Sequence, residues 1–153
     1  MRRKRVMAVA SAGGHWVQLR RLALALEGTD VFYVGVSDEC AADLSADDAW
    51  YTVPNVTRRN AGNLLRLVPR LLSIVIRERP NVVLTTGAAP GLVAIAIART
   101  LLGSKTIWID SIANCERMST SGRFARHFAT VWLTQWPHLS KESGRPSFWG
   151  AVL

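Results

Sequence analysis

The stretch RVMAVASAGGH, residues 5–15, decides the fold of this chain, because it joins an apolar run to a glycine turn. The run Arg5–Ala10 has the length and composition of a short buried strand. The small residues Ser11–Gly14 predict a tight turn, and apolar residues then recur at helical spacing over His15–Leu26, until Gly28. This strand, turn and helix predict the first unit of an alternating α/β fold.

The same alternation continues along the chain. Runs of apolar and β-branched residues predict strands at 31–36, 50–53, 81–84, 106–109 and 130–134. Helical spacing predicts helices at 60–78, 91–102 and 119–128, and we expect a loop or short helix at 37–48. Strands that are apolar throughout are typical of a parallel sheet covered on both faces. The sequence therefore predicts one α/β domain over 1–153, a Rossmann-like parallel sheet with helices on both faces, ending in an irregular tail over 137–153.

The chain has the length of one ordinary domain, 153 residues, and is strongly basic. Lys and Arg outnumber Asp and Glu by 19 to 11, which gives a net charge of +8. Such an excess favours anionic partners, namely a phosphorylated ligand, an acidic membrane face or a nucleic acid, although a basic protein without a special partner is the alternative. Because the basic residues are not interleaved with a recognisable nucleic-acid-binding motif, we expect no nucleic acid partner. A basic nucleotide- or nucleic-acid-binding Rossmann domain stays as the weaker alternative.

The sequence offers no membrane-spanning segment and no metal site. No stretch reaches the roughly 20 uninterrupted apolar residues that a spanning helix needs, so we expect any membrane contact to be peripheral. The apolar run after the basic N-terminus is too short for a signal peptide. The two cysteines form no CxxC pair, and His127 and His138 have no ligand spacing to His15. We therefore predict no metal and no other cofactor.

Three loops follow predicted strands, and ligands bind at the carboxyl ends of the strands in sheets of this kind. In the first loop, Gly13 and Gly14 let the backbone approach a ligand, the helix start attracts a phosphate, and Ser11 lies beside them. His15 is the first catalytic candidate, since it could donate to a diphosphate oxygen or accept a proton from an attacking hydroxyl group. The alternative is a glycine turn needed only for strand–helix packing. The loop lacks the GxGxxG pattern of dinucleotide-binding domains.

The second and third loops carry small and polar residues at corresponding positions. Thr86 could bond phosphate or sugar oxygens and Gly87 leaves room for a ligand, unless this loop only caps the next helix. Asp110 is the second catalytic candidate, because a carboxylate there could orient a sugar hydroxyl group or act as a base, with Ser111 beside it. The alternative for Asp110 is helix capping or a salt bridge to Arg117.

The predicted helix 60–78 has an apolar and a basic face. Its apolar positions are Leu64, Val68, Leu71, Leu72 and Val75, which form a surface broad enough to pack on the sheet and also to contact lipid. Basic residues on the opposite face or just before the helix could meet anionic lipid, at about 1 kcal/mol each. They are Arg58, Arg59, Arg66, Arg70 and Arg77. The commoner alternative is a helix that only packs on the sheet. Trp16 and Trp149 are among the tryptophans predicted as interfacial anchors.

Four short motifs give the chain a family resemblance: SAGGH at 11–15, TTGAAP at 85–90, TIWIDS at 106–111 and LTQWP at 133–137. Their order and spacing resemble the oligosaccharide-biosynthesis family that contains the membrane-anchor subunit of the eukaryotic dolichyl-diphosphate N-acetylglucosamine transferase. Bacterial relatives belong to capsule and exopolysaccharide pathways. The chain departs from the family pattern where Ser11-Ala12 replaces a common Gly and where Asp110 replaces a common Glu.

The resemblance implies a role as well as a fold. It implies the N-terminal domain of a GT-B glycosyltransferase, split off as its own chain, with the three loops holding a lipid-diphosphate-linked saccharide acceptor at the cytoplasmic face of the cell membrane. A donor-binding subunit would hold the UDP-sugar, so the chain would be an inactive hexosyltransferase subunit when alone. A non-catalytic membrane scaffold for a partner glycosyltransferase is the main alternative.

Overall fold

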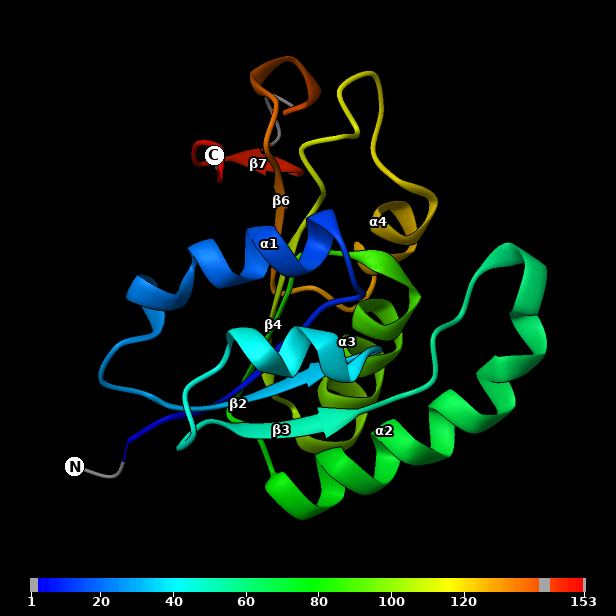
Figure 1. Ribbon diagram of the computed structural model, residues 1–153. Helices are drawn as coiled ribbons and strands as arrows, with labels where there is room; N and C mark the ends of the chain where they lie inside the picture. The colour runs from blue at the N-terminus through cyan, green and yellow to red at the C-terminus, as the bar shows by residue number, and fades with distance from the viewer. Residues whose placement is uncertain (1–2, 141–143, 153) are drawn as a thin grey trace.

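The computed structural model describes residues 3–140 and 144–152, which form a parallel sheet between two layers of helices (Figure 1). The strands are β1 (Arg5–Val9), β2 (Asp30–Gly35), β3 (Ala49–Thr52), β4 (Val82–Thr85), β5 (Lys105–Ile109), β6 (Val131–Thr134) and β7 (Ser147–Phe148). They pair in the order β3-β2-β1-β4-β5-β6-β7, and every neighbouring pair is parallel. The parallel sheet predicted from the sequence is confirmed.

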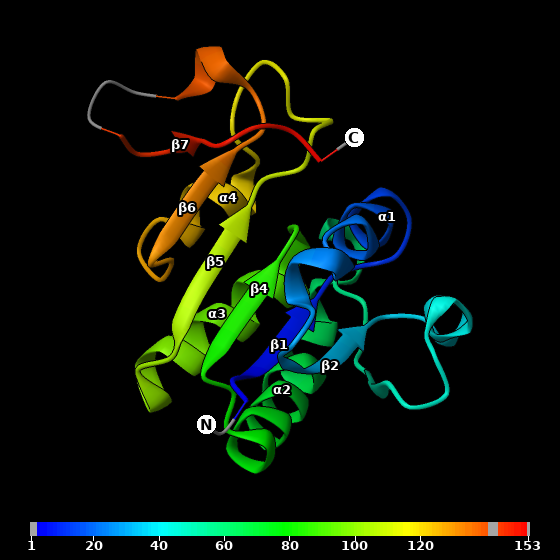
Figure 2. The ribbon, with the colours of Figure 1, turned by 90° about the vertical axis from the view of Figure 1, so that its left-hand side faces the viewer.

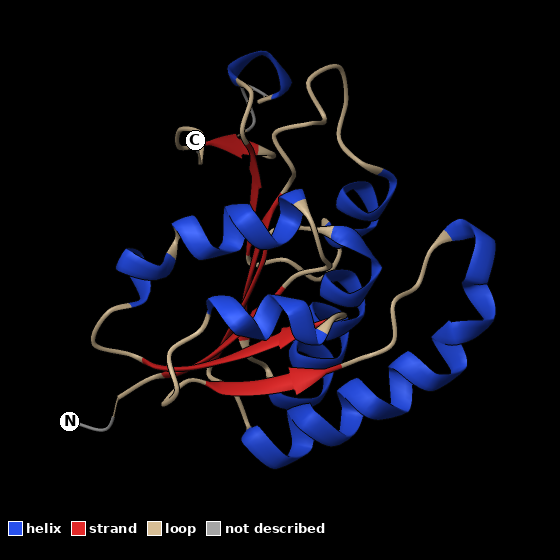
Figure 3. Ribbon diagram, viewed as in Figure 1, coloured by secondary structure: helices blue, strands red, loops and turns tan. Residues whose placement is uncertain are grey.

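Helices and short 3-10 turns supply the crossovers that parallel pairing requires (Figure 3). The α-helices of the described residues are α1 (Gly14–Arg21), α2 (Leu64–Glu78), α3 (Ala88–Leu102) and α4 (Thr120–Ala125). The 3-10 turns are η1 (Ala23–Leu26), η2 (Asp38–Asp43), η3 (Arg58–Asn63) and η4 (Pro137–Leu139).

Alternate side chains of each strand point to opposite faces of the sheet and form two cores. Met7 and Val9 belong to the core that packs against α2, α3 and α4. Tyr33 belongs to the other core, which contains Trp16 and Leu19 of α1. Figure 2 shows α1 on the opposite side of the sheet from α2 and α3. Burial on both faces explains why the strands are apolar throughout.

The buried face of α2 takes up only part of the apolar surface predicted from the sequence. Its buried residues are Leu67, Leu71, Ile74 and Val75. Leu64 and Val68, two of the predicted apolar positions, are 42% and 39% exposed. In Figure 1 the start of α2 reaches past the end of β3 together with η3. Leu67 in the first turn is nevertheless fully buried, so the buried stripe begins there and Leu64 and Val68 lie beside it.

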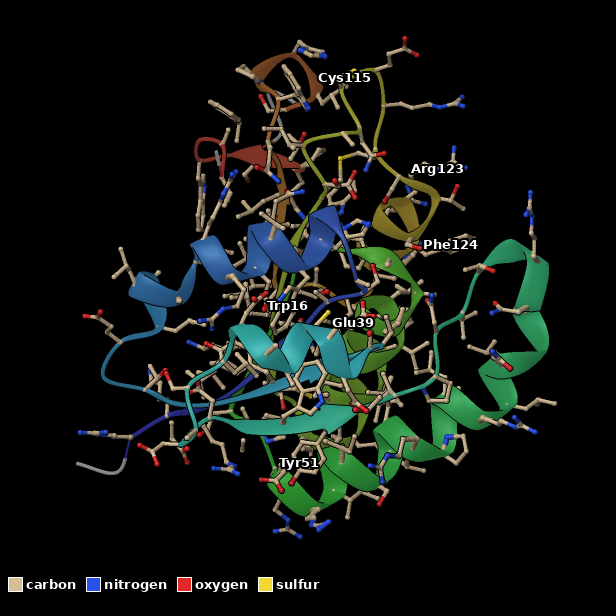
Figure 4. All side chains as sticks on the ribbon, viewed as in Figure 1. Trp16, Glu39, Tyr51, Cys115, Arg123 and Phe124 are labelled. Atoms are coloured by element: carbon tan, nitrogen blue, oxygen red, sulfur yellow. The ribbon has the colours of Figure 1, made fainter. Side chains whose placement is uncertain are left out.

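Two expectations are corrected. Trp16 is not an interfacial anchor, because it lies between α1 and the sheet at 3% exposure (Figure 4). Its ring packs edge-on against Tyr33 and Trp50, and its Nε1 donates to Asp43 at 2.9 Å. The tail is not wholly irregular either, since β7 pairs with β6.

Candidate functional site

The direction in which strands are added reverses between β1 and β4. β2 and β3 extend the sheet on one side of β1, whereas β4, β5 and β6 extend it on the other side. The connections that follow β1 and β4 lead to helices on opposite faces of the sheet, and we call the carboxyl edge between these two loops the crevice. Open α/β sheets bind ligands at such a point. The first two predicted loops, Ser11–His15 and Thr86–Pro90, therefore flank this crevice.

His15 is fastened to the loop after β4 by two reciprocal hydrogen bonds. Its Nδ1 lies 2.8 Å from the carbonyl oxygen of Thr86, and the Thr86 hydroxyl donates to the carbonyl oxygen of His15 at 2.6 Å. Because a carbonyl oxygen only accepts, the ring proton is assigned to Nδ1. In the neutral ring, Nε2 then keeps its lone pair. A half-buried histidine held in this way can accept a proton at Nε2 or, when charged, donate to an anion.

Gly87 is the residue that lets the His15 ring approach the second loop. Its φ of 126° lies in a region that side chains with a Cβ rarely adopt. A Cβ at this position would lie 2.8 Å from Cε1 of the His15 ring. Any side chain at 87 would therefore displace either the ring or the loop.

Two helices start beside this contact, and neither start is capped by a side chain. Gly13 is the N-cap of α1 and Gly87 is the N-cap of α3, and no acidic residue occupies either first turn. The first N–H groups of a helix have no partner within it, and its dipole is positive at this end. A Cβ on Gly13 or Gly14 would meet no atom within 4 Å, so the first loop is open on its outer side. The crevice therefore favours an anion such as a phosphate.

Asp110 lies directly after β5, but its carboxylate is buried at 2% exposure. Its Oδ1 accepts from Nε1 of Trp108 at 3.1 Å and from the hydroxyl of Ser119 at 2.6 Å. Its Oδ2 accepts from the N–H of Ser119 at 2.8 Å and from the amide of Asn114 at 3.2 Å. Both carboxylate oxygens are thus occupied, and they hold the loop 110–119 against the end of β5.

Ser111 is buried as well and belongs to a second polar cluster. Its hydroxyl accepts from Gln18 of α1 at 3.2 Å. Gln18 in turn accepts from Gln135, which follows β6. The two glutamines were not among the site residues predicted from the sequence. The only sequence signal for Gln18 is that it is a polar residue among the apolar positions of its helix. Gln135 lies in the LTQWP motif, but no role was assigned to it.

The basic residues predicted for lipid contact lie outside the crevice, on η3 and α2. Arg59, Arg66, Arg70 and Arg77 are exposed, and the side chain of Arg58 lies outside the part of the chain that the structure describes.

Three apolar side chains at the start of α2 are exposed among these arginines. Leu64, Leu65 and Val68, which we call the α2 tip, are 42%, 84% and 39% exposed. Since α2 is reached from the carboxyl end of β3, the α2 tip lies at the same edge of the sheet as the loops.

A cavity lies at the opposite edge of the sheet. It has a volume of about 800 Å³ and is lined by the amino end of β1 and its neighbours, including Arg5, Asp30 and Glu78. Arg5 is ion-paired with both of these carboxylates. Because its central charges are already paired, this cavity is a weaker candidate for ligand binding than the carboxyl edge, where helix starts and His15 are open.

Comparison with known proteins identifies the family. The family model described as "Oligosaccharide biosynthesis protein Alg14 like" matches residues 63–152, which is more than half of the chain. The chain belongs to the Alg14-like family. The match contains the second and third loops, and the first loop lies before it.

Curated Alg14 relatives align over almost the whole chain, including the first loop. The chain is 27% identical to the UDP-N-acetylglucosamine transferase subunit ALG14 of Eremothecium gossypii, over 98% of this chain and 80% of that protein. It is 25% identical to the protein of the same name from Mus musculus, over 97% of this chain and 83% of that protein.

Solved structures confirm the fold of this Alg14-like chain. Acinetobacter baumannii MurG superposes with a TM-score of 0.72 at 15% identity, covering 92% of this chain and 44% of MurG. The UDP-GlcNAc 2-epimerase of Methanocaldococcus jannaschii gives a TM-score of 0.62 at 13% identity, over 87% of this chain and 39% of that chain. The chain thus has a Rossmann-like fold of the GT-B type and spans less than half the length of these solved chains. Among its described residues, no helix has the length and hydrophobicity to cross a bilayer.

Proposed function

We propose that this Alg14-like chain is the acceptor-binding subunit of a two-chain, UDP-sugar-dependent glycosyltransferase that acts on a polyprenyl-diphosphate-linked saccharide. Its curated relatives are named as subunits of UDP-N-acetylglucosamine transferases. The observation that carries the proposal is the contact of His15 with Thr86 between two uncapped helix starts. This contact combines a proton acceptor with anion-binding N–H groups in one crevice.

In this proposal the acceptor diphosphate binds at the starts of α1 and α3, close to Ser11, Gly13 and Gly14. The Thr86 hydroxyl is already committed to the His15 carbonyl, so Thr86 positions the histidine rather than binding phosphate directly. The separate donor-binding chain holds the UDP-sugar above the crevice. The two chains together form the active site, and neither is active alone.

Transfer then proceeds as a single displacement with inversion. The acceptor hydroxyl oxygen forms a bond to the anomeric carbon of the donor sugar as the bond from that carbon to UDP breaks. The hydroxyl proton passes to Nε2 of His15, whose Nδ1–H is held by Thr86. The neutral ring is the form that this step requires.

Asp110 and Ser111 have a different place in the proposal. Direct proton transfer by Asp110 stays a prediction from the sequence, but its burial and its bonds to Trp108, Asn114 and Ser119 favour a positioning role. We propose that Asp110 fixes the third loop so that the loop can contact the acceptor saccharide.

We further propose that the complex docks peripherally on the cytoplasmic face of the cell membrane through the α2 tip. The exposed side chains of Leu64, Leu65 and Val68 can enter the headgroup region, and the exposed arginines beside them can meet anionic lipid. This places the lipid-borne acceptor at the edge of the sheet where the loops are.

The test is reconstitution of the chain with a donor-binding subunit, UDP-sugar and a lipid-diphosphate acceptor. We expect a stable complex with transfer activity that neither chain shows alone. His15→Ala should lower the rate of the complex by about 10²- to 10⁴-fold, the usual contribution of a general base. The exposed His127 provides the matched control, and His127→Ala should leave the rate unchanged.

Two results would count against the proposal. Sugar transfer by the purified chain alone would remove the need for a donor-binding subunit. Full activity of the His15→Ala complex would favour the scaffold alternative, in which this chain only recruits its partner to the membrane.

A further inference from the structure

We infer that Gln18 and Gln135 are positioning residues, a buried pair of amides that fixes the first and third acceptor loops to each other and to the C-terminal segment 147–152. The two side chains come from α1 and from the end of β6, and they are 5% and 3% exposed. The inference rests on the proposed function only for its activity readout, since the network itself can be measured in the chain alone.

Gln18 joins the first loop to the third. Its Nε2 donates to the carbonyl oxygen of Gly14 and to the hydroxyl of Ser111, both at 3.2 Å. Its Oε1 accepts from the N–H of Ile112 at 3.3 Å. The residue beside His15 and two residues of the third loop are therefore held by one side chain.

Gln135 connects this side chain to the C-terminal segment. Its Nε2 donates to Oε1 of Gln18 at 2.5 Å and to the carbonyl oxygen of Asp110 at 2.9 Å. Its Oε1 accepts from the N–H of Val152 at 2.7 Å. Because Nε2 faces two acceptors and Oε1 faces a donor, the orientation of this amide is determined by its partners.

The pair forms a continuous path from Val152 to the two acceptor loops. Both donor hydrogens of each amide are used, and so are both acceptor positions of Gln18. A buried amide that loses a partner leaves another polar group without one, which is costly in a low-dielectric interior. The network therefore tolerates one arrangement of the loops and of the segment, and a displaced segment disturbs the acceptor loops.

The decisive variants are a pair at Val152. Val152→Pro removes the N–H that donates to Gln135, whereas Val152→Ala keeps the N–H and shortens the side chain. We expect the ¹⁵N-labelled Pro variant to shift the backbone resonances of Gly14 and Ile112 and to speed solvent exchange of both glutamine side-chain amides. The Ala variant should leave these signals in place. Unchanged signals of Gly14 and Ile112 in the Pro variant would overturn the inference.

A second measurement covers the case in which Val152→Pro does not fold. Gln18→Ala, Gln135→Ala and the double variant form a thermodynamic cycle, with unfolding followed by urea denaturation. We expect the double variant to be more stable than the sum of the two single losses predicts, because each single change already breaks the shared network. Additive losses would show that the two amides act independently and would also overturn the inference.

The reconstituted complex supplies the functional readout. Gln135→Ala should raise the KM for the lipid-diphosphate acceptor and lower kcat by about tenfold, without changing the KM for UDP-sugar. Ser104→Ala is the control, because Ser104 is 5% exposed and loses a hydrogen bond to Pro80, but lies at the amino end of β5. An equal loss in the control would mean that Gln135 acts only through stability. If no complex is active, the proposed function fails, and the resonance and denaturation results still decide the inference.

Discussion

At the scale of single residues, His15 owes its position to the backbone of another loop rather than to a neighbour in the sequence. The rule that ligands bind at the carboxyl ends of parallel strands singled out the loops that contain His15, Thr86 and Asp110. Which two of these loops meet at the point where the strand order reverses was shown by the structure. The contact itself could not be predicted from the sequence, because its hydrogen bonds are accepted by backbone carbonyl oxygens, which every residue has. The burial of Asp110 could not be predicted from the sequence either, since its hydrogen-bond partner Ser119 lies nine residues further along the chain.

Gly87→Ala tests the close approach of the His15 ring. The added Cβ would meet the ring at 2.8 Å. A misplaced base of this kind costs about 10²-fold in rate, so we expect a loss of that order in the reconstituted complex. Gly103→Ala is the matched control. Gly103 also has a positive φ, 64°, but a Cβ there meets nothing within 4 Å. Both variants should be less stable, and equal activity of the two would contradict the assigned role of Gly87.

At the scale of elements, α2 combines a buried stripe, which packs on the core, with exposed apolar residues at its start. The helix itself and its arginine face were predictable from periodicity. The position of the buried stripe was not, because the apolar surface of the helix is broader than the part that packs on the core. Leu67 is fully buried, whereas Leu64 and Val68 are partly exposed. Leu67, Leu71, Ile74 and Val75 anchor the helix, and the α2 tip stays exposed.

Leu65→Glu tests the α2 tip as a lipid-binding surface. Leu65 is 84% exposed, so the change should not destabilise the fold. Removing one inserted leucine forfeits about 1.5–3 kcal/mol of burial, so vesicle binding should weaken by at least about tenfold. Leu24→Glu introduces the same charge at a residue of η1 that is 79% exposed and should not alter binding. The measurement is cosedimentation with vesicles of anionic lipid at low and high salt, and equal binding of both variants would refute the role of the α2 tip.

At the scale of the whole molecule, the two edges of the sheet have different roles. The carboxyl edge holds the open loops, and the amino edge holds a paired charge cluster that connects three elements. Arg5 of β1 pairs with Glu78 at the end of α2, and Glu78 accepts a hydrogen bond from Tyr51 of β3 at 2.5 Å. This edge stabilises the fold without taking part in the proposed chemistry.

The charge cluster predicts how stability depends on pH. Burial alone would raise the pKa of the Glu78 carboxyl, but hydrogen bonds from Tyr51 and Arg5 outweigh burial and lower that pKa below its usual 4.5. A depressed pKa contributes stability that is complete above the ordinary value and is lost as the pH falls through the folded value. We therefore expect the melting temperature to fall as the pH drops below about 4.5.

Glu78→Gln isolates this contribution. The variant should melt about 2–4 °C lower at pH 7, for a loss of about 1 kcal/mol in a domain of this size. Its melting temperature should decline less steeply in acid than that of the wild type. The exposed Glu116 serves as the control, and Glu116→Gln should follow the wild-type curve. Parallel curves for the wild type and Glu78→Gln would contradict the linkage.

The place of β1 in the sheet also sets the order in which the molecule can be made. β1 is synthesised before both of its neighbours in the sheet, β2 and β4, and β4 begins only at Val82. Until that residue has left the ribosome, one side of β1 has no partner strand, and its unpaired backbone N–H and C=O groups are open to pairing with other chains. Pairing of distant parallel strands is slow as well. The nascent chain is therefore most exposed to aggregation after β1 and before β4 has been synthesised.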